Sequence, residues 1–181
     1  MKQFLSNAAA YALMSAVAVN FAAKDAVLQG AIAISTQINP ETIPKNVEDQ
    51  INAIVISVKN RVPSGNKLAL LSHMHDILYD EQAYHMNPEA PFKIEAQSIH
   101  NALEESSGSY SVLAVIYYEV ARRLGLDVHA ISLPFFMMVA VNVGGTLYVD
   151  VDTGRHMSIP ELKEAVRLSD AKWDDRMLTP I

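Results

Sequence analysis

The sequence predicts an α+β fold in which helices surround a buried central helix and pack on a small antiparallel sheet. Three observations lead to this prediction. Residues 107–126 are apolar on nearly every face of a helix, which is typical of a helix that is buried on all sides. The segments before this stretch have helical periodicity. The segments after it, over 127–151, are rich in the β-branched and aromatic residues that favour strands.

The central helix has recognisable signals at both ends. Ser109 can cap its start, because a serine hydroxyl accepts one of the orphan backbone N–H groups there, and Gly108 lets the chain turn into the helix. Arg122 and Arg123 lie in the last turn, where positive charge suits the helix dipole. Gly125 then fits the left-handed conformation that ends many helices. Burial of each large apolar side chain contributes about 1.5–3 kcal/mol before entropy is subtracted.

Four helices are predicted between residue 22 and the central helix. The first covers residues 22–36, with a break near Asn20 or Gly30 as an alternative. The second begins at Pro44, which suits a first helical turn. A turn at 63–66 separates it from a helix over 68–79, and a shorter helix over 94–103 buries Ile99 and Leu103. Residues 82–92 are predicted to form a loop. The stripe that the second helix turns to the core consists of Val47, Ile51, Ile54, Val55 and Val58.

The second half of the chain predicts a sheet followed by one more helix. Strands are expected over 127–133, 136–143 and 146–151, and Gly144 with Gly145 fits a two-residue hairpin turn. Ser158 is expected to cap the last helix. Its inner face consists of Leu162, Ala165, Val166 and Leu168. In the polar tail over 169–181, Trp173 is the side chain expected to hold the tail on the domain.

Composition indicates one domain over residues 1–181 and excludes several classes of function. The net charge is −6 and basic residues are scattered, whereas a nucleic-acid-binding protein needs a basic face. The sequence contains no cysteine, so it has no disulfide, no cysteine-ligated metal and no cysteine nucleophile. A reducing compartment such as the cytoplasm fits this composition.

Residues 3–23 carry no charged side chain, and three interpretations remain open. The stretch can be an export signal, a membrane-spanning helix, or an amphipathic helix that packs on the domain. Phe4, Tyr11, Met14 and Phe21 recur at helical spacing, and the polar residues and alanines weaken membrane insertion. We therefore expect an extra helix over residues 1–20 that packs on the domain and that can also mediate homo-oligomer contacts.

The central helix carries a resemblance to a known family. Its run from Val115 to Leu126, VIYYEVARRLGL, resembles the core helix of the SirB1-type transglutaminase-like family. A strand, the pair Leu133-Pro134, a hairpin and Asp150 at a strand end follow as in that family. The likeness spans residues 21–168 and implies a transglutaminase-like, papain-related fold.

The resemblance also implies where a catalytic triad would lie. An active member has a cysteine thiolate at the start of the central helix, a histidine on an adjacent strand and an aspartate that orients the histidine. These positions correspond to Tyr110, Phe136 and Asp150. Phenylalanine cannot transfer a proton, and a tyrosine of ordinary pKa is a poor nucleophile. SirB1-type proteins often lack the cysteine as well, and the loss of the histidine departs further from the family.

Two interpretations of these positions remain open. Tyr110 and Phe136 can fill a former cleft as core residues, or they can line a small aromatic pocket with Asp150 at its edge that holds a peptide side chain or a cation. Asp150 and Asp152 can bind a cation weakly, or they can serve a turn through Asp152-Thr153-Gly154. Glu104 and Glu105 with Arg122 and Arg123 are expected to lie on solvated faces or to form surface pairs.

Histidines near residue 75 invite a metal interpretation. His73, His75, Asp76 and His85 are close in the sequence, but residues two apart on a helix point to opposite sides. His129 and His156 have no ligand spacing. No metal and no cofactor are therefore predicted.

The sequence analysis favours a non-catalytic protein that binds or regulates a protein partner, without nucleic acid and without a membrane. A hydrolase of another type that uses aspartate and histidine groups is the alternative.

Overall fold

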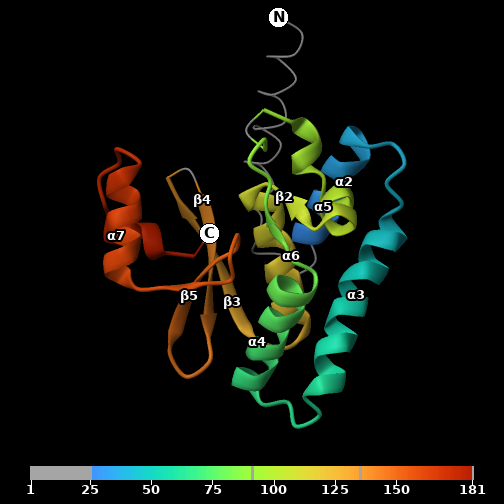
Figure 1. The fold of residues 1–181 in the computed structure, drawn as a ribbon, viewed down its shortest axis with the longest axis horizontal. Helices are drawn as coiled ribbons and strands as arrows, with labels where there is room; N and C mark the ends of the chain where they lie inside the picture. Colours follow the sequence, from blue (N-terminus) through green and yellow to red (C-terminus); the bar gives the residue numbers. More distant parts are fainter. Residues whose placement is uncertain (1–25, 91, 135, 181) are drawn as a thin grey trace, which may run out of the picture.

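The computed structural model describes residues 26–180 except positions 91 and 135 (Figure 1). The predicted extra helix over residues 1–20 and the predicted break near Asn20 lie outside the described residues. Helices and a four-stranded sheet form an α+β fold, as predicted. The helices between residues 26 and 123 lie on one side of the sheet, and the helix α7 (Ile159–Leu168) lies on the other (Figure 1).

The helical side is built around α6, Tyr110–Arg123. Its side chains from Val112 to Ala121 are all buried. The surrounding elements are α2 (Ala26–Ile38), α3 (Pro44–Arg61), α4 (Lys67–His75), the π-helix η1 (Asp76–Glu81), the 3-10 helix η2 (Ile94–Gln97) and α5 (Ile99–Glu105). The predicted stripe of α3 is entirely buried, and Pro44 is its first residue. The predicted caps of α6 are also present, since the Ser109 side chain accepts from the N–H of Val112 and Gly125 has φ +79°.

The sheet is an antiparallel meander of four strands in the order β3-β4-β5-β6. The strands are β3 (Asp127–Leu133), β4 (Phe136–Asn142), β5 (Thr146–Asp150) and β6 (His156–Met157). Alternate residues of β4 serve opposite faces, because Val139 and Val141 join the core around α6 whereas Met138 and Ala140 join a second core under α7. The last elements are α7 (Ile159–Leu168) and the 3-10 helix η3 (Asp175–Leu178).

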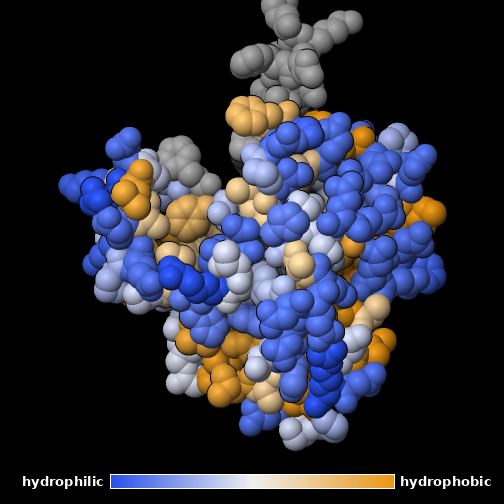
Figure 2. Space-filling model, in the orientation of Figure 1, coloured by the Kyte–Doolittle hydropathy of each residue, from blue (hydrophilic) through white to orange (hydrophobic). Residues whose placement is uncertain are grey.

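Trp173 packs against the core under α7, and its indole N–H donates to Asp175 over 2.7 Å. The tail therefore lies on the domain, as expected. Hydrophilic side chains cover most of the face drawn in Figure 2, which fits helices that turn their apolar sides inward.

Several local predictions are wrong. The alternative break near Gly30 is absent, because the first described helix continues through this residue, and the helix ends at Ile38, two residues later than predicted. The helix expected over 68–79 changes to π geometry at Asp76. The helix expected over 94–103 is divided at Ser98, which ends η2 and caps α5. The loop over 82–92 contains β1 (His85–Met86), a strand that pairs in parallel with β2 (Ser107–Gly108).

The second half needs three corrections. The hairpin between β4 and β5 has a three-residue connection, because β4 ends at Asn142, one residue earlier than expected, and Asn142 pairs with Thr146. The short strand β6 was not predicted. Leu168 was placed on the inner face of α7, but it is 69% exposed, because the helix ends there and the next residue, Ser169, caps it.

Candidate functional site

The start of α6 is held by close packing and hydrogen bonds. The Ser109 hydroxyl donates to the side-chain oxygen of Gln97 over 2.7 Å while it also accepts from the N–H of Val112 at 3.4 Å. A Cβ on Gly108 would lie 3.0 Å from the Cβ of Ala102, so glycine serves here for close approach of two elements. This differs from the turning role expected from sequence. The result is a fixed position for Tyr110, the first residue of the helix.

The rings of Tyr110 and Phe136 lie side by side, with their centroids 6.2 Å apart and their planes inclined by 53°. Both side chains are half-buried. Tyr110 packs against the core around α6, whereas Phe136 shares the face of β4 that packs under α7. The pair therefore bridges the two layers at one end of the sheet. Its geometry is that of a tilted aromatic contact.

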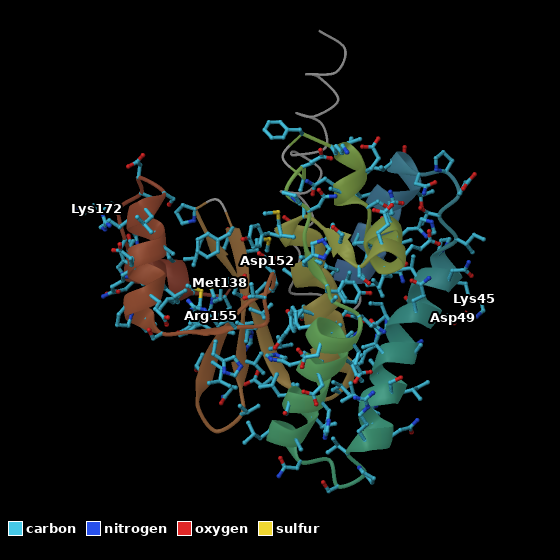
Figure 3. The ribbon with its side chains drawn as sticks, in the orientation of Figure 1. Lys45, Asp49, Met138, Asp152, Arg155 and Lys172 are labelled. Atoms are coloured by element: carbon cyan, nitrogen blue, oxygen red, sulfur yellow. The ribbon has the colours of Figure 1, made fainter. Side chains whose placement is uncertain are left out.

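Asp150 is the last residue of β5, and Asp152 lies in the turn that follows the strand. The Asp150 carboxylate accepts from the N–H of Asp152 and from the Thr153 hydroxyl, both at 3.0 Å. The Asp152 carboxylate accepts from the N–H of Met86 over 2.6 Å, which ties the turn to β1. Figure 3 places Asp152 between the sheet and the helices. The turn interpretation therefore agrees with the contacts of Asp150, whereas the Asp152 carboxylate bonds to a distant strand.

Asp150 and Asp152 are near enough to Tyr110 to affect its ionisation. Partial burial raises the pKa of Tyr110, and the negative charges of Asp150 and Asp152 raise it further. The phenol therefore stays neutral at neutral pH. The structure thus brings together the four positions singled out from sequence, namely Tyr110, Phe136, Asp150 and Asp152, as two aromatic rings beside two carboxylates.

His75 lies between the helices and β6. Its Nε2 is 2.7 Å from the Tyr117 hydroxyl, and its ring is 5.5 Å from the ring of His156. Burial lowers the pKa of His75 to about 4, with a further decrease from His156 and a smaller opposing effect from Asp76. Burial raises the pKa of Tyr117 well above its ordinary value. This pair therefore consists of a neutral imidazole and a neutral phenol.

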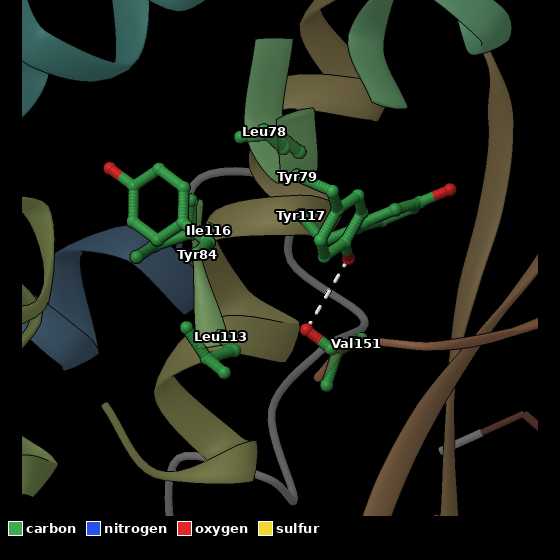
Figure 4. Close-up of a pocket in the computed structure, with 7 residues that line it drawn as sticks. All are labelled: Leu78, Tyr79, Tyr84, Leu113, Ile116, Tyr117 and Val151. Carbon is green, nitrogen blue, oxygen red and sulfur yellow. Dashed lines mark hydrogen bonds between the residues drawn. The ribbon is translucent and has the colours of Figure 1, made fainter. Parts of the chain in front are cut away.

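A small cavity of about 10 Å³ lies beside this pair (Figure 4). The Tyr79 hydroxyl donates to the carbonyl of Val151 across it, over 3.3 Å. Its volume is that of a single water molecule, so the cavity has no room for a substrate. The residues that line it are Leu78, Tyr79, Tyr84, Leu113, Ile116, Tyr117 and Val151.

The remaining histidines are dispersed. His73 Nδ1 is 3.0 Å from the Asp76 carboxylate and His129 Nε2 is 3.1 Å from Asp127, whereas His85 contacts the Ala83 carbonyl of its own loop. His73 and His75 have different neighbours, as expected for residues two apart on a helix. Within residues 26–180, positions 91 and 135 apart, no three histidine or acidic side chains lie together as metal ligands would.

Glu119 is a residue whose role was not foreseen. It is fully buried on α6, and its carboxylate accepts from Arg122 and from Arg123, each with an N–O distance of 2.7 Å. Arg123 also donates to Asn52 and Glu48 of α3, both over 2.6 Å. Glu104 and Glu105 are exposed, as one of the two alternatives expected, but the arginines do not pair with them and instead hold a buried carboxylate. The sequence signal was an acidic residue three and four positions before two arginines, inside an otherwise apolar helix.

No helix among the described residues is long and apolar enough to cross a membrane.

Comparison with known proteins places the chain in a family. A model described as the transglutaminase-like superfamily matches residues 45–181. Two curated proteins of Xylella fastidiosa, each named UPF0162 protein, are similar over 108 residues, with 33% identity in strain 9a5c and 32% in strain Temecula1 / ATCC 700964. The similar region covers 58% of this chain and 38% of each relative, so the chain spans well under half the length of these relatives. No solved structure is significantly similar. Because the family model covers most of its length, the chain belongs to the transglutaminase-like superfamily.

Proposed function

We propose that this protein is a non-catalytic, SirB1-type member of the superfamily that acts as a protein-binding or regulatory accessory module. The observation that carries the proposal is the contact between Tyr110 and Phe136, with ring centroids 6.2 Å apart. By the family resemblance, these rings stand where an active relative has its thiol and its imidazole. An aromatic contact has replaced a pair of groups that exchange a proton.

The absence of catalysis follows from the chemistry of these side chains. Acyl transfer needs a nucleophile that a neighbouring base can deprotonate. Tyr110 keeps its proton, because burial and two carboxylates raise its pKa. A shift of the family alignment by one residue along β4 does not supply a base, because the sequence there reads Phe135-Phe136-Met137. None of these three side chains can accept a proton.

The pair of His75 and Tyr117 does not replace the missing groups. Tyr117, which carries the hydroxyl, is 1% exposed, and burial strongly disfavours its phenolate form. The adjoining cavity of about 10 Å³ admits no acyl substrate. These contacts support a structural role for the pair.

The aromatic pair and its carboxylates instead suit recognition of a protein surface. Half-buried aromatic rings provide contact area with little loss of conformational entropy, and they are enriched in protein interfaces. Asp150 and Asp152 add negative charge beside the rings, and the whole chain has a net charge of −6. A partner with a basic surface fits this site through electrostatic complementarity.

The absence of catalysis can be tested with purified protein. We expect no incorporation of an amine donor into a glutamine-containing protein, and no hydrolysis of peptide, ester or amide substrates, above the rate in buffer. Tyr110→Phe, which removes only the hydroxyl, serves as the control. Turnover that is lost in this variant would overturn the non-catalytic proposal.

Binding can be tested with matched aromatic substitutions. The protein is immobilised and exposed to extract of its native host, and the retained proteins are compared among wild type, Tyr110→Ala, Phe136→Ala and Phe92→Ala. Phe92 is 83% exposed and serves as a surface control. We expect a partner that wild type and Phe92→Ala retain and that both site variants lose. Equal retention by all four proteins would show that this site does not bind it.

A further inference from the structure

A second site lies between α3, the end of η1 and the end of α5. Here the surface forms a groove of about 510 Å³, which is within the usual range for ligand sites. It is separate from the aromatic pair, because neither ring of that pair lines it. The residues that line it are Gln50, Ala53, Ile54, Ser57, Glu81, Gln82, Tyr84, Leu103 and Ser106.

Tyr84 is the most informative of these residues. It is 6% exposed, and within the described part of the chain its hydroxyl has no hydrogen-bond partner. In Figure 4 this hydroxyl points away from the small cavity and from the hydroxyls of Tyr79 and Tyr117. Among the described residues, every fully enclosed side-chain polar atom has a hydrogen-bond partner. The unpaired Tyr84 hydroxyl is therefore not fully enclosed, and we infer that it is accessible through the groove that Tyr84 lines. Buried hydroxyls normally have a partner, and this hydroxyl can find one only in the groove, where a ligand would take the place of water.

The lining of the groove is polar but offers no unpaired charge. Arg61 holds the Glu81 carboxylate with two hydrogen bonds, of 2.6 and 2.9 Å. The Gln50 and Gln82 amides each supply a donor and an acceptor, and neither has a partner among the described residues. Such a surface favours an uncharged ligand that both donates and accepts hydrogen bonds.

The backbone around the groove is strained. Ala83 and Ser106 both have φ +53°, a left-handed conformation that is uncommon for residues other than glycine. The N–H of His85 donates to the Ser106 carbonyl over 3.1 Å, so a hydrogen bond connects the two strained segments. The π-helix η1 ends at the same place, at Glu81. Strain and π geometry of this kind occur often at ligand sites, which agrees with a binding role.

We propose that this groove binds an uncharged peptide segment through its backbone amides, with the Tyr84 hydroxyl and the Gln50 and Gln82 amides as its hydrogen-bond partners. A peptide group presents one donor and one acceptor, which matches the two glutamine amides. Ile54 and Leu103 supply the apolar contact for small side chains. A saccharide fits less well, because the ring of Tyr84 is buried and exposes no face on which a sugar can stack.

The test uses N-acetyl-trialanine amide as a probe, added to isotope-labelled full-length protein and followed by NMR chemical shifts. We expect shifts at Gln82, Ser106 and their neighbours, and none at Tyr110. Tyr84→Phe removes only the hydroxyl and should weaken binding about three- to tenfold, since one neutral hydrogen bond is lost. Tyr79→Phe is the matched control, because its hydroxyl bonds to Val151 in the other cavity, and it should leave the affinity unchanged.

Each remaining outcome overturns the proposal. These are the absence of shifts in the groove up to the solubility limit of the probe, equal affinity in Tyr84→Phe, and stronger shifts in the groove with maltotriose. Thermal unfolding supplies an independent check, because loss of an unpaired hydroxyl should not destabilise the protein. A clear decrease of Tm in Tyr84→Phe would mean that the hydroxyl already has a partner within the chain. Tyr110→Ala should bind the probe as wild type does, which separates this site from the one in the proposed function.

Discussion

Replacement of Gly154 by alanine tests how the turn after β5 packs on the helices. Gly154 has φ +69°, and a Cβ at this position would lie 2.4, 2.6 and 2.9 Å from three atoms of the Tyr79 ring. The ring has little freedom to move away, because its hydroxyl donates to Val151 and its edge contacts His75. Gly65 has nearly the same φ, +67°, but no atom lies within 4 Å of a Cβ there. Alanine at either position therefore has the same cost of a left-handed backbone, but only alanine at Gly154 would also clash with a side chain.

The magnitudes follow from these two terms. A left-handed alanine costs about 1–2 kcal/mol, and this term applies at both positions. Overpacking against a fixed ring adds about 1–3 kcal/mol at Gly154 alone. We therefore expect Gly65→Ala to lower the free energy of unfolding by about 1–2 kcal/mol and Gly154→Ala to lower it by about 2–5 kcal/mol, from the sum of the two terms. The effect of alanine on the unfolded chain cancels in the comparison.

Urea denaturation measures both variants, with unchanged m-values as the condition for comparing them. A double-mutant cycle sharpens the result, since Tyr79→Leu should remove most of the additional penalty of Gly154→Ala. If Gly154→Ala is no more destabilising than Gly65→Ala, the close packing of Gly154 against the Tyr79 ring is refuted.

Three further predictions concern stability. Glu119→Ala should lower the free energy of unfolding by about 3–5 kcal/mol, because two arginines lose a buried partner. Glu164→Ala, on the exposed face of α7, is the control and should change this free energy little. Equal effects of the two substitutions would refute a stabilising role for the buried ion pairs of Glu119. The lowered pKa of His75 means that the unfolded chain binds a proton more readily than the native one between about pH 6.5 and pH 4. Stability should therefore fall as the pH decreases through this window, by at most about 3 kcal/mol from this group, and His75→Gln should show a flatter pH profile in urea denaturation. Trp173→Ala should cost about 1–3 kcal/mol, since the ring is only partly buried, and limited proteolysis should then cleave the tail sooner.

The main elements were predictable because their signals are local. Ser109 and Gly125 mark the ends of α6 through capping chemistry, and the stripe of α3 follows from helical periodicity. The turn role of Asp150 followed in the same way, since an aspartate side chain readily accepts from the backbone N–H two residues further on, here that of Asp152.

What could not be predicted depends on distant parts of the chain. The strand His85–Met86 exists because Ser107 and Gly108 lie beside it, and two residues give no periodic pattern. The groove at Tyr84 needs three elements that are far apart in sequence. The contact between Tyr110 and Phe136 was inferred only through the family resemblance, because nothing local relates the start of a helix to the start of a strand.

The arrangement of Glu119 also bears on how the core assembles. Arg122 and Arg123 belong to the same helix as the carboxylate they bind, three and four residues further on. The helix can therefore neutralise its own acidic group as soon as its turns form, before any other segment arrives. The Glu119 carboxylate is therefore already paired with two cations when the other elements bury α6. The packing of α3 then adds the hydrogen bonds from Arg123 to Glu48 and Asn52.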